Sequence, residues 1–401
     1  MMKASNNNTH PLESLLKQHC PNGVEFKELG EVTIQNAFKQ LGASELERLK
    51  TNNGNIRLLP SSNNNDWCSN EELCKNYICD GEIITLGRAR YANLKYHKGK
   101  FVSSNNIIIQ AKNDILCKYL YYFIATHTKN FYVETPTYPK FDNQIFQKTQ
   151  IPLPPLEIQQ KIVDILDAFT ELEAELEAEL EARLKQYHYY RNKLLSHDEL
   201  ENRTAKSRND SDPTPIVPYV RLGEVCEKVF AGGDLPKEYS KDKKPSGEFL
   251  YPIYSNGSDE NSLYGFSKTY RIDAEAVTIS ARGTIGFHTT REAKFTPIVR
   301  LITLIPNLNK ITNRFLNYAL YTTHIEKYGT SAGIPQLTIP MLEKITIPLP
   351  PLEVQNEIVE LLDKFDTLAN DLSAGLPAEI EARKKQYEYY RERLLSFIAK
   401  D

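Results

Sequence analysis

Two long stretches of the chain carry apolar residues at steps of mostly three and four positions, over 157–196 and 354–398. This spacing draws one apolar stripe along an α-helix. Prolines such as Pro155 stand directly before each stretch and prevent an earlier start of the helix. The pattern therefore predicts two long helices, the second of them kinked at Gly375 and Pro377.

A stripe of this length needs a covering surface, because an isolated amphipathic helix would leave its apolar face in water. The opposite faces are rich in glutamate, which favours a coiled coil between the two helices. The alternative is that each helix packs separately in the core of its own domain.

The segments that precede these helices have a different pattern. Short β-type runs alternate with Gly and Asn turns over 82–110 and 275–306, and a helical stretch follows each, over 115–128 and 311–326. We predict that each segment belongs to an α+β domain with a twisted mixed sheet.

The chain also repeats itself. Residues 151–166 read IPLPPLEIQQKIVDIL, and 196 positions later residues 347–362 read IPLPPLEVQNEIVELL. A second pair of blocks, 200 positions apart, reads EARLKQYHYYRNKLLS over 181–196 and EARKKQYEYYRERLLS over 381–396. Two paired blocks of this length indicate a tandem duplication.

Weaker matches extend the duplication into the α+β segments, where Arg88 aligns with Arg282 and Phe101 with Phe295. The chain thus divides into an N-terminal segment, a variable domain, a shared helix, a polar linker with prolines, a second variable domain and a second shared helix. The predicted bounds of these parts are 1–22, 23–150, 151–197, 198–217, 218–346 and 347–401.

Charge is distributed unevenly over these parts. Each variable domain has 16 Lys and Arg against 13 Asp and Glu, whereas residues 151–200 have 5 against 11 and residues 347–401 have 7 against 11. The net charge of -3 for the whole chain argues against binding of nucleic acid. The two basic domains still permit such binding, because DNA affinity depends on local phosphate contacts. Since the basic excess is modest, we expect partner subunits to supply part of these contacts.

Motifs for catalysis and metal binding are missing. There is no glycine-rich nucleotide loop and no His-Glu-x-x-His motif, and the S-x-x-K match from Ser14 to Lys17 lacks its companion motifs. Four cysteines over 68–117 are spaced more widely than the tight pairs that bind zinc. We predict a non-catalytic chain without a metal site. An apolar run of ~18 residues and a signal peptide are also missing, so we expect a cytoplasmic protein with no membrane contact.

The repeated blocks resemble those of the specificity subunits of Type I restriction–modification enzymes. The resemblance rests on the two IPLPPLE runs, the two KQY-x-YYR-x-x-LLS blocks and the runs VTISARGTIG and GIPQLT, and it covers about 23–397. The LEAE-type repeat over 172–183 and the KKQYEYYR tail are most similar to the IC subfamily. The resemblance implies an α+β fold in which two globular target recognition domains are separated by two long antiparallel coiled-coil helices, as a pseudo-twofold tandem repeat.

The resemblance also implies a function and partners. Such a subunit reads an asymmetric, bipartite site in double-stranded DNA, one half per recognition domain, and the helices set the spacer. It assembles with two modification subunits, which bind S-adenosylmethionine and methylate adenine, and with two restriction subunits, which bind ATP and magnesium. No cofactor is expected in this chain.

Candidate DNA-contacting residues follow from the chemistry of base edges, which are read by Arg, Lys, Asn and Gln. In the first domain they are Arg88, Arg90, Lys95, Tyr96, Lys98, Tyr138 and Lys140. In the second they are Tyr254, Asn256, Ser258, Arg282, Thr284, His288 and Gln336. For most of them a solvated loop or a phosphate contact fits the sequence as well as base reading. Arg88 and Arg282 are shared by both halves, so we expect a phosphate-positioning or structural role for them.

Candidate partner-docking residues lie at matching ends of the acidic helices, which suit two identical modification subunits. They are Glu157, Glu353, Glu357 and Glu360. Two rival functions are an enzyme that fuses recognition to cleavage and a purely structural coiled-coil scaffold. The missing catalytic motifs disfavour the first, and the second leaves two divergent basic domains unexplained.

Overall fold

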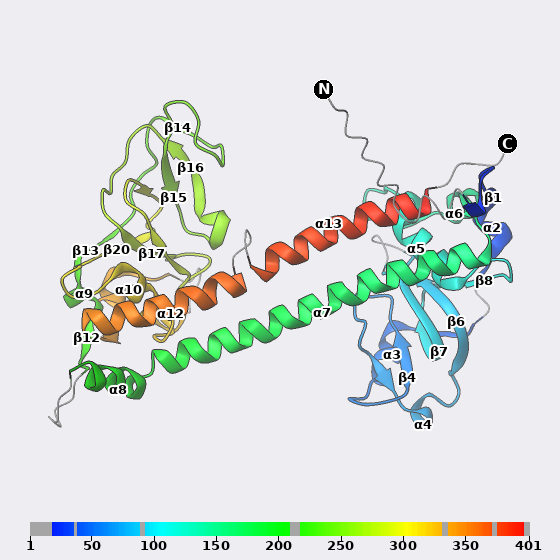
Figure 1. Ribbon diagram of the computed structural model, residues 1–401, viewed down its shortest axis with the longest axis horizontal. Helices are drawn as coiled ribbons and strands as arrows, with labels where there is room; N and C mark the ends of the chain where they lie inside the picture. The colour runs from blue at the N-terminus through cyan, green and yellow to red at the C-terminus, as the bar shows by residue number, and fades with distance from the viewer. Residues whose placement is uncertain are drawn as a thin grey trace. The chain divides into compact units, whose positions relative to one another are not determined.

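The chain divides into two compact units, of which the first comprises 1–177 and 379–401 and the second 178–378. In each unit a globular α+β part adjoins segments of long helix (Figure 1). The computed structural model describes residues 18–35, 38–88, 93–208, 217–330, 336–370 and 375–396.

The first unit is built on a seven-stranded sheet with the order β2-β8-β6-β7-β4-β5, in which β3 also pairs with β7. Strands β3 and β4 run parallel to β7 and the other pairings are antiparallel, so the mixed sheet expected here is confirmed. The strands are β2 (Thr33–Gln35), β3 (Gln40–Leu41), β4 (Ile56–Leu59), β5 (Cys68–Ser69), β6 (Cys79–Leu86), β7 (Lys95–Ser104) and β8 (Ile107–Ala111).

Alternating side chains of β6 enter different hydrophobic clusters, as the period of two along a strand requires. Ile84 packs with Tyr119 of helix α5 (Cys117–His127), whereas Ile83 packs with Phe101 of β7. The other elements of the unit are β1 (Glu25–Glu28), α2 (Leu29–Val32), α3 (Ala43–Arg48), α4 (Glu71–Cys74), α5 (Cys117–His127), η1 (Thr128–Phe131), β9 (Tyr132–Val133), β10 (Lys140–Phe141), α6 (Asn143–Lys148) and β11 (Gln150–Leu153).

The second unit contains two four-stranded sheets. The order β13-β20-β17-β18 is wholly antiparallel, whereas in β14-β16-β15-β19 the β15–β19 pair is parallel. The strands are β12 (Tyr219–Arg221), β13 (Cys226–Ala231), β14 (Tyr239–Ser240), β15 (Tyr251–Tyr254), β16 (Leu263–Ser267), β17 (Ala276–Ile279), β18 (His288–Arg291), β19 (Thr296–Pro297), β20 (Ile302–Pro306) and β21 (Thr346–Pro348). The short helices are α9 (Leu222–Val225), η2 (Asp259–Ser262), α10 (Asn313–Leu320), η3 (Ile325–Tyr328) and α11 (Ile339–Leu342).

The duplication recurs in the topology. The order β2-β8-β6-β7 matches β13-β20-β17-β18, and the pair β1-β11 matches β12-β21. Phe101 and Phe295, which align in the sequence, are both fully buried. The domains differ in what is added to this shared sheet: β4 and β5 extend it in the first unit, whereas the second unit builds a separate sheet.

The long helices pair in antiparallel fashion within the first unit. Phe169 of α7 stacks on Tyr390 of α13 with 5.5 Å between ring centroids, and Glu173, one turn later in α7, pairs with Lys384, which precedes Tyr390 in α13. The residue numbers therefore rise along α7 in the direction in which they fall along α13, so the two helices run antiparallel here. The long helices and the helix after α7 are α7 (Leu156–Leu194), α8 (His197–Arg208), α12 (Leu352–Asn370) and α13 (Leu376–Leu395).

The second unit repeats this stacking with the roles exchanged. There Tyr190 of α7 stacks on Phe365 of α12 with 5.4 Å between ring centroids. The first turns of α7 and α12 make different contacts, since Ile162 and Ile358 lie fully buried in the cores of the α+β domains. Both interpretations of the apolar stripes are therefore correct. The first turns of α7 and α12 pack in the core of an α+β domain, and later turns pack against another long helix.

One stretch differs from the sequence-based prediction. Residues 198–208, expected in a linker, lie in helix α8, because Leu200 is fully buried in the core of the second unit and Glu199 pairs with Arg203 one turn on. Residues 209–216 lie outside the described part of the chain. The kink expected at Gly375 and Pro377 lies next to residues 371–374, which are also outside the described part of the chain; α12 is described as far as Asn370 and α13 from Leu376.

Candidate nucleic-acid interface

In the first domain, three candidate residues gather where β6 ends. The exposed Arg88 follows β6, its carbonyl accepts a hydrogen bond from the Phe141 amide at 3.2 Å, and its guanidinium donates to the Asn106 carbonyl at 3.5 Å. The segment with Tyr138 and Lys140 is thereby held beside the end of the strand, and the Lys140 ammonium lies 5.8 Å from the centre of the Tyr138 ring. A cation, an aromatic ring and a second cation are a suitable set for nucleic acid.

The second domain has a similar arrangement with different side chains. Arg282 follows β17 and bridges to Gln336, whose side-chain oxygen accepts from the guanidinium at 3.4 Å. The next amide, of Leu337, donates to the Ala281 carbonyl at 3.1 Å. Thr284 is exposed in the same turn. The duplication therefore places corresponding segments at corresponding strand ends but gives them different hydrogen-bonding groups.

Lys95 differs from its predicted role. Its side chain is buried, and its ammonium donates to the carbonyls of Pro60, Ser62 and Asn64 at 2.6, 2.8 and 3.1 Å. Burial, aided by the nearby charge of Arg57, lowers the pKa of Lys95 to about 8. An ammonium with three carbonyl acceptors has no donor left for a phosphate, so Lys95 holds the 60–64 turn in place.

Two candidates of the second domain are likewise used within the protein. The Asn256 amide accepts from the Ala281 amide at 2.8 Å and donates to the Val299 carbonyl at 2.6 Å. His288 is buried in β18 with its Nδ1 atom 2.9 Å from the side-chain oxygen of Asn317. Both side chains thus make contacts within the domain, which differs from the role expected from residue type.

Three further candidates have partners inside the protein. The Tyr96 hydroxyl donates to Glu82 at 2.7 Å, and the exposed Lys98 pairs with the same carboxylate at 3.2 Å. The guanidinium of Arg291 lies 3.7 Å from the centre of the Tyr254 ring. Ser258 is half-buried, and Arg90 lies outside the described residues.

A lysine-rich turn of the second domain was missing from the predicted set. Lys241, Lys243 and Lys244 are exposed between β14 and β15, and Lys237 is exposed just before β14. The run KDKKPSG is visible in the sequence and, with its proline and glycine, indicates an exposed turn. Such lysines suit phosphate contacts, which carry no sequence information.

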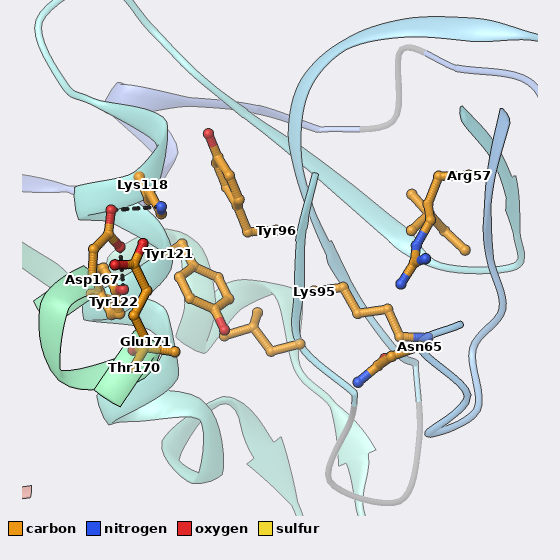
Figure 2. A pocket seen from close by; sticks show the side chains of 12 residues that line it. Arg57, Asn65, Lys95, Tyr96, Lys118, Tyr121, Tyr122, Asp167, Thr170 and Glu171 are labelled. Atoms are coloured by element: carbon orange, nitrogen blue, oxygen red, sulfur yellow. Dashed lines mark hydrogen bonds and ion pairs between the residues drawn. The ribbon is translucent and has the colours of Figure 1, made fainter. Parts of the chain in front are cut away.

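A groove of about 380 Å³ lies in the first unit where the sheet adjoins α7. Figure 2 shows Arg57, Asn65 and Lys95 on one side, Asp167 and Glu171 of α7 on the other, and Tyr96 and Tyr121 between them. A smaller groove of about 140 Å³ in the second unit is lined by residues that include Arg314, Tyr318 and Asp366. Both grooves therefore mark the junction between an α+β domain and its long helix.

The described residues offer no centre for catalysis of a familiar kind. Among them, no group of three or more His, Cys, Asp or Glu is placed to hold a metal ion. The cysteines are free, and burial raises the pKa of Cys117 and Cys226 to about 12, so these thiols are protonated at neutral pH. Within the same described residues, no helix is long and apolar enough to span a membrane.

The glutamates predicted to dock partners are all exposed. Glu157 pairs with Lys161 at 2.7 Å and Glu360 with Lys364 at 2.8 Å, each along its own helix. Glu357 forms an ion pair with Arg203 of α8 and thus joins two helices of the second unit.

Comparison with known proteins gives a consistent result over both halves of the chain. Residues 21–186 and 217–382 each match the family model of the type I restriction modification DNA specificity domain. A protein named as a type I specificity subunit from Mycoplasma pneumoniae is 38% identical over 340 residues, which cover 81% of this chain and 96% of that protein. One named as a type I restriction enzyme specificity subunit from Haemophilus influenzae is 32% identical and covers 98% of this chain and 99% of its own length.

Solved structures show the same fold. The S subunit of a type I restriction-modification system from M. genitalium matches 93% of this chain and 96% of its own, with a TM-score of 0.60 at 18% identity. A chain solved in work on complex assembly and conformational transition of a type I R-M system matches 94% of this chain and 98% of its own, with a TM-score of 0.54 at 18% identity. The predicted α+β tandem fold is thereby confirmed.

Proposed function

Because this chain belongs to the family of type I restriction–modification DNA specificity proteins, we propose that it selects the DNA site on which partner subunits methylate adenine or cut. The observation that carries this proposal is the second copy of the specificity domain. Each copy has its own core and its own residues beside the end of a central strand, which we call the strand-end residues: Arg88 and Lys140 at β6, and Arg282 and Gln336 at β17. Two different readers in one chain are what an asymmetric site with two half-sites requires. The chain itself is a recognition subunit and not an enzyme.

Two strand-end residues are the proposed readers of the two half-sites. Lys140 and Gln336 occupy aligned positions and differ in chemistry: lysine donates to guanine O6 and N7, whereas glutamine can both donate to and accept from adenine. Arg88 and Arg282 are shared, so we assign them to phosphate positioning. In this proposal the two domains differ at the residues that read DNA bases, Lys140 and Gln336. They agree at the arginines that contact the DNA phosphates, Arg88 and Arg282.

The chemical steps are assigned to partner proteins. We propose an assembly with two modification subunits, which bind S-adenosylmethionine and methylate adenine, and two restriction subunits, which bind ATP and magnesium. No cofactor is assigned to this chain, and the cytoplasm is its proposed location. The duplication supports two copies of each partner, because a pseudo-twofold repeat offers one surface twice.

The repeated tyrosine block supports docking of the modification subunits on the long helices. Its residues Tyr190 and Tyr390 stack against the opposite helix, whereas Tyr189 and Tyr389 are 60% and 55% exposed. The residue before each exposed tyrosine has diverged, to histidine in one copy and glutamate in the other. Exposed tyrosines retained in both copies suit an interface, where tyrosine is enriched among the residues that dominate binding.

The test of function uses the chain together with its modification subunit. Sequencing of methylated adenines in DNA treated with the assembly should give one motif with two half-sites and a constant spacer. The same DNA treated with either protein alone should give no methylation of that motif. A motif with a single continuous recognition sequence would contradict the assignment of one half-site to each domain.

The docking surface is tested by charge reversal. Glu353→Lys with Glu360→Lys should weaken the assembly in native mass spectrometry, because both carboxylates are exposed and neither joins two helices. Glu357 stays unchanged, since its pair with Arg203 connects α12 to α8. Glu238→Lys, next to Lys237 of the lysine-rich turn, is the control. Undiminished assembly of the double variant would contradict docking at this end of the helix.

A further inference from the structure

We propose that two matching polar clamps, one in each unit, fix the angle of each recognition domain on its long helix and make the subunit selective for spacer length. The clamp residues are Gln159 and Asp167 of α7 in the first unit and Gln355 and Asp363 of α12 in the second. The inference rests on the proposed function, in which the helices set the distance between half-sites.

The glutamine of each clamp is buried and ties the helix to the backbone of its domain. The Gln159 side chain accepts from the Leu116 amide at 2.9 Å and donates to the carbonyls of Pro154 at 2.9 Å and Asp114 at 3.3 Å. It is 1% exposed. A glutamine amide that bonds backbone on both sides of the junction holds the first turn of α7 in one rotational position, because hydrogen bonds are directional.

The second clamp repeats these bonds atom for atom. The Gln355 side chain accepts from the Thr312 amide at 2.9 Å and donates to the carbonyls of Pro350 at 2.8 Å and Lys310 at 2.9 Å. Its side chain is fully buried. Every residue in this set lies 196 positions after its counterpart in the first unit, so the whole contact was duplicated and kept.

The aspartate of each clamp lies two turns further along the helix. Asp167 accepts from the Tyr122 hydroxyl at 2.5 Å and from the Lys118 ammonium at 2.6 Å, and both donors come from α5 of the domain (Figure 2). Burial, together with the bond to Asp167, raises the pKa of Tyr122, so the hydroxyl is a donor at neutral pH. Two points of attachment, separated along the helix, resist both tilting and rotation of the domain.

The aspartate of the second unit has the same partners by position. Asp363 accepts from the Tyr318 hydroxyl at 2.6 Å and from two nitrogens of Arg314 at 3.0 and 2.6 Å. Arg314 stands where the first unit has Lys118, so the copies changed the cation but retained the charge and the contact. The domains have diverged elsewhere on α5 and α10, for example at Tyr121 and Asn317, which face the grooves.

The angle at this junction controls where the reading residues lie. A domain of this size is about 30 Å across, and one base pair advances the DNA by about 3.4 Å along its axis. A rotation of only about 6° at the junction would therefore displace the far side of the domain by one base pair. Apolar packing of Ile162 and Leu166 supplies burial but little direction, so the polar clamps are the contacts that can set the angle.

The experiment measures adenine methylation by the complex of this chain with its modification subunit. The substrates are three duplexes that contain the motif found by methylation sequencing, with the natural spacer and with one base pair added or removed. Asp167→Ala should lower the ratio of rates between the natural and the altered spacers by about tenfold, since it removes both acceptors of a charge-assisted contact. Asp363→Ala should do the same from the second unit. The half-site sequences should stay unchanged.

Matched variants separate positioning from folding. Tyr119 lies on α5 like Tyr122 and is also buried. Its hydroxyl donates to the Pro152 carbonyl of β11 and not to α7. Tyr119→Phe should therefore leave spacer selectivity unchanged. Lys118→Arg, which copies the second unit, should also retain it. If Asp167→Ala lowers solubility, Tyr122→Phe is the substitute, because it removes only the hydroxyl bond to Asp167 and leaves the bond from Lys118 in place.

Two results would overturn the inference. One is an equal fall in rate on all three duplexes, which would make the clamp a purely structural contact. The other is an unchanged rate and an unchanged ratio in both aspartate variants. A wild-type complex that methylates no bipartite site would instead contradict the proposed function, and that is known before any variant is compared.

Discussion

Replacing His288 with glutamine should remove a pH dependence of stability from the second unit. The His288 ring lies buried in β18, with Asn317 as its hydrogen-bond partner and Tyr321 in an edge-to-face contact at 4.3 Å between ring centroids. Burial outweighs the bond to Asn317 and lowers the pKa of His288 to about 4. A glutamine amide can still donate to the Asn317 oxygen but carries no charge at any pH.

The direction of the effect is set by proton binding in the two states. Between pH 6.5, the ordinary value for histidine, and pH 4, the unfolded chain binds the proton and the folded chain does not. The contribution of His288 to the free energy of unfolding is therefore complete above pH 6.5 and is lost as the pH falls toward 4. At pH 5 the difference amounts to about 2 kcal/mol relative to neutral pH, from 1.36 kcal/mol per pKa unit.

Urea unfolding at pH 7 and pH 5 measures this difference, with an internal control in the same sample. Trp67 is the only tryptophan and lies in the first unit, so its fluorescence follows that unit, whereas circular dichroism follows both. The transition assigned to the second unit should shift more in the wild type than in His288→Gln. Equal shifts in the two proteins would refute the assignment of the acid sensitivity to this histidine.

Three further predictions concern the DNA site and the partners. Exchanging residues 23–150 for those of a related subunit should change one half-site in the methylation pattern and leave the other, because each domain has its own core; a change in both halves would contradict independent reading. Duplicating Leu176–Glu179 adds about 6 Å to α7 and turns the remainder of the helix by about 40°, so sequencing of methylated adenines should show a spacer one base pair longer with the same half-sites, whereas deleting these residues should shorten the spacer or abolish activity. An unchanged spacer with full activity would show that α7 is not the ruler. Tyr189→Ala and Tyr389→Ala should each leave a complex with one modification subunit in native mass spectrometry, and two retained subunits in the double variant would exclude these side chains from docking.

The long helices and the duplication could be predicted because both depend on patterns that local sequence carries. Apolar spacing specifies a helix whatever covers it, and repeated blocks need no structure to be seen. The same reasoning failed at 198–208, where a polar composition indicated a linker. The buried Leu200 and an ion pair from Glu199 to Arg203 help to hold a helix there, and neither stands out in a polar segment.

The individual DNA-contacting residues could not be predicted to the same extent, because burial of a polar side chain depends on distant segments. Lys95 looks like a phosphate contact in the sequence, but the carbonyls that bind its ammonium belong to residues 60–64, more than thirty positions earlier. His288 depends in the same way on Asn317 of α10. Residue type predicts which groups can bind DNA, whereas tertiary contacts decide which of them are free.

The duplication supplies a comparison within one chain that residue type alone does not. Lys95 and His288 occupy matching places in the two sheets. Lys95 pairs with Thr85 near the end of β6, and His288 pairs with Ile279 at the end of β17. Both side chains are buried in spite of their different chemistry. The strand-end pair Lys140 and Gln336 also differs, but Lys140 is exposed and Gln336 half-buried. Divergence at an accessible position suits a change of DNA sequence, whereas divergence at a buried one requires a change of internal partner. Positions that combine divergence with exposure are therefore the first to exchange when a half-site is to be altered.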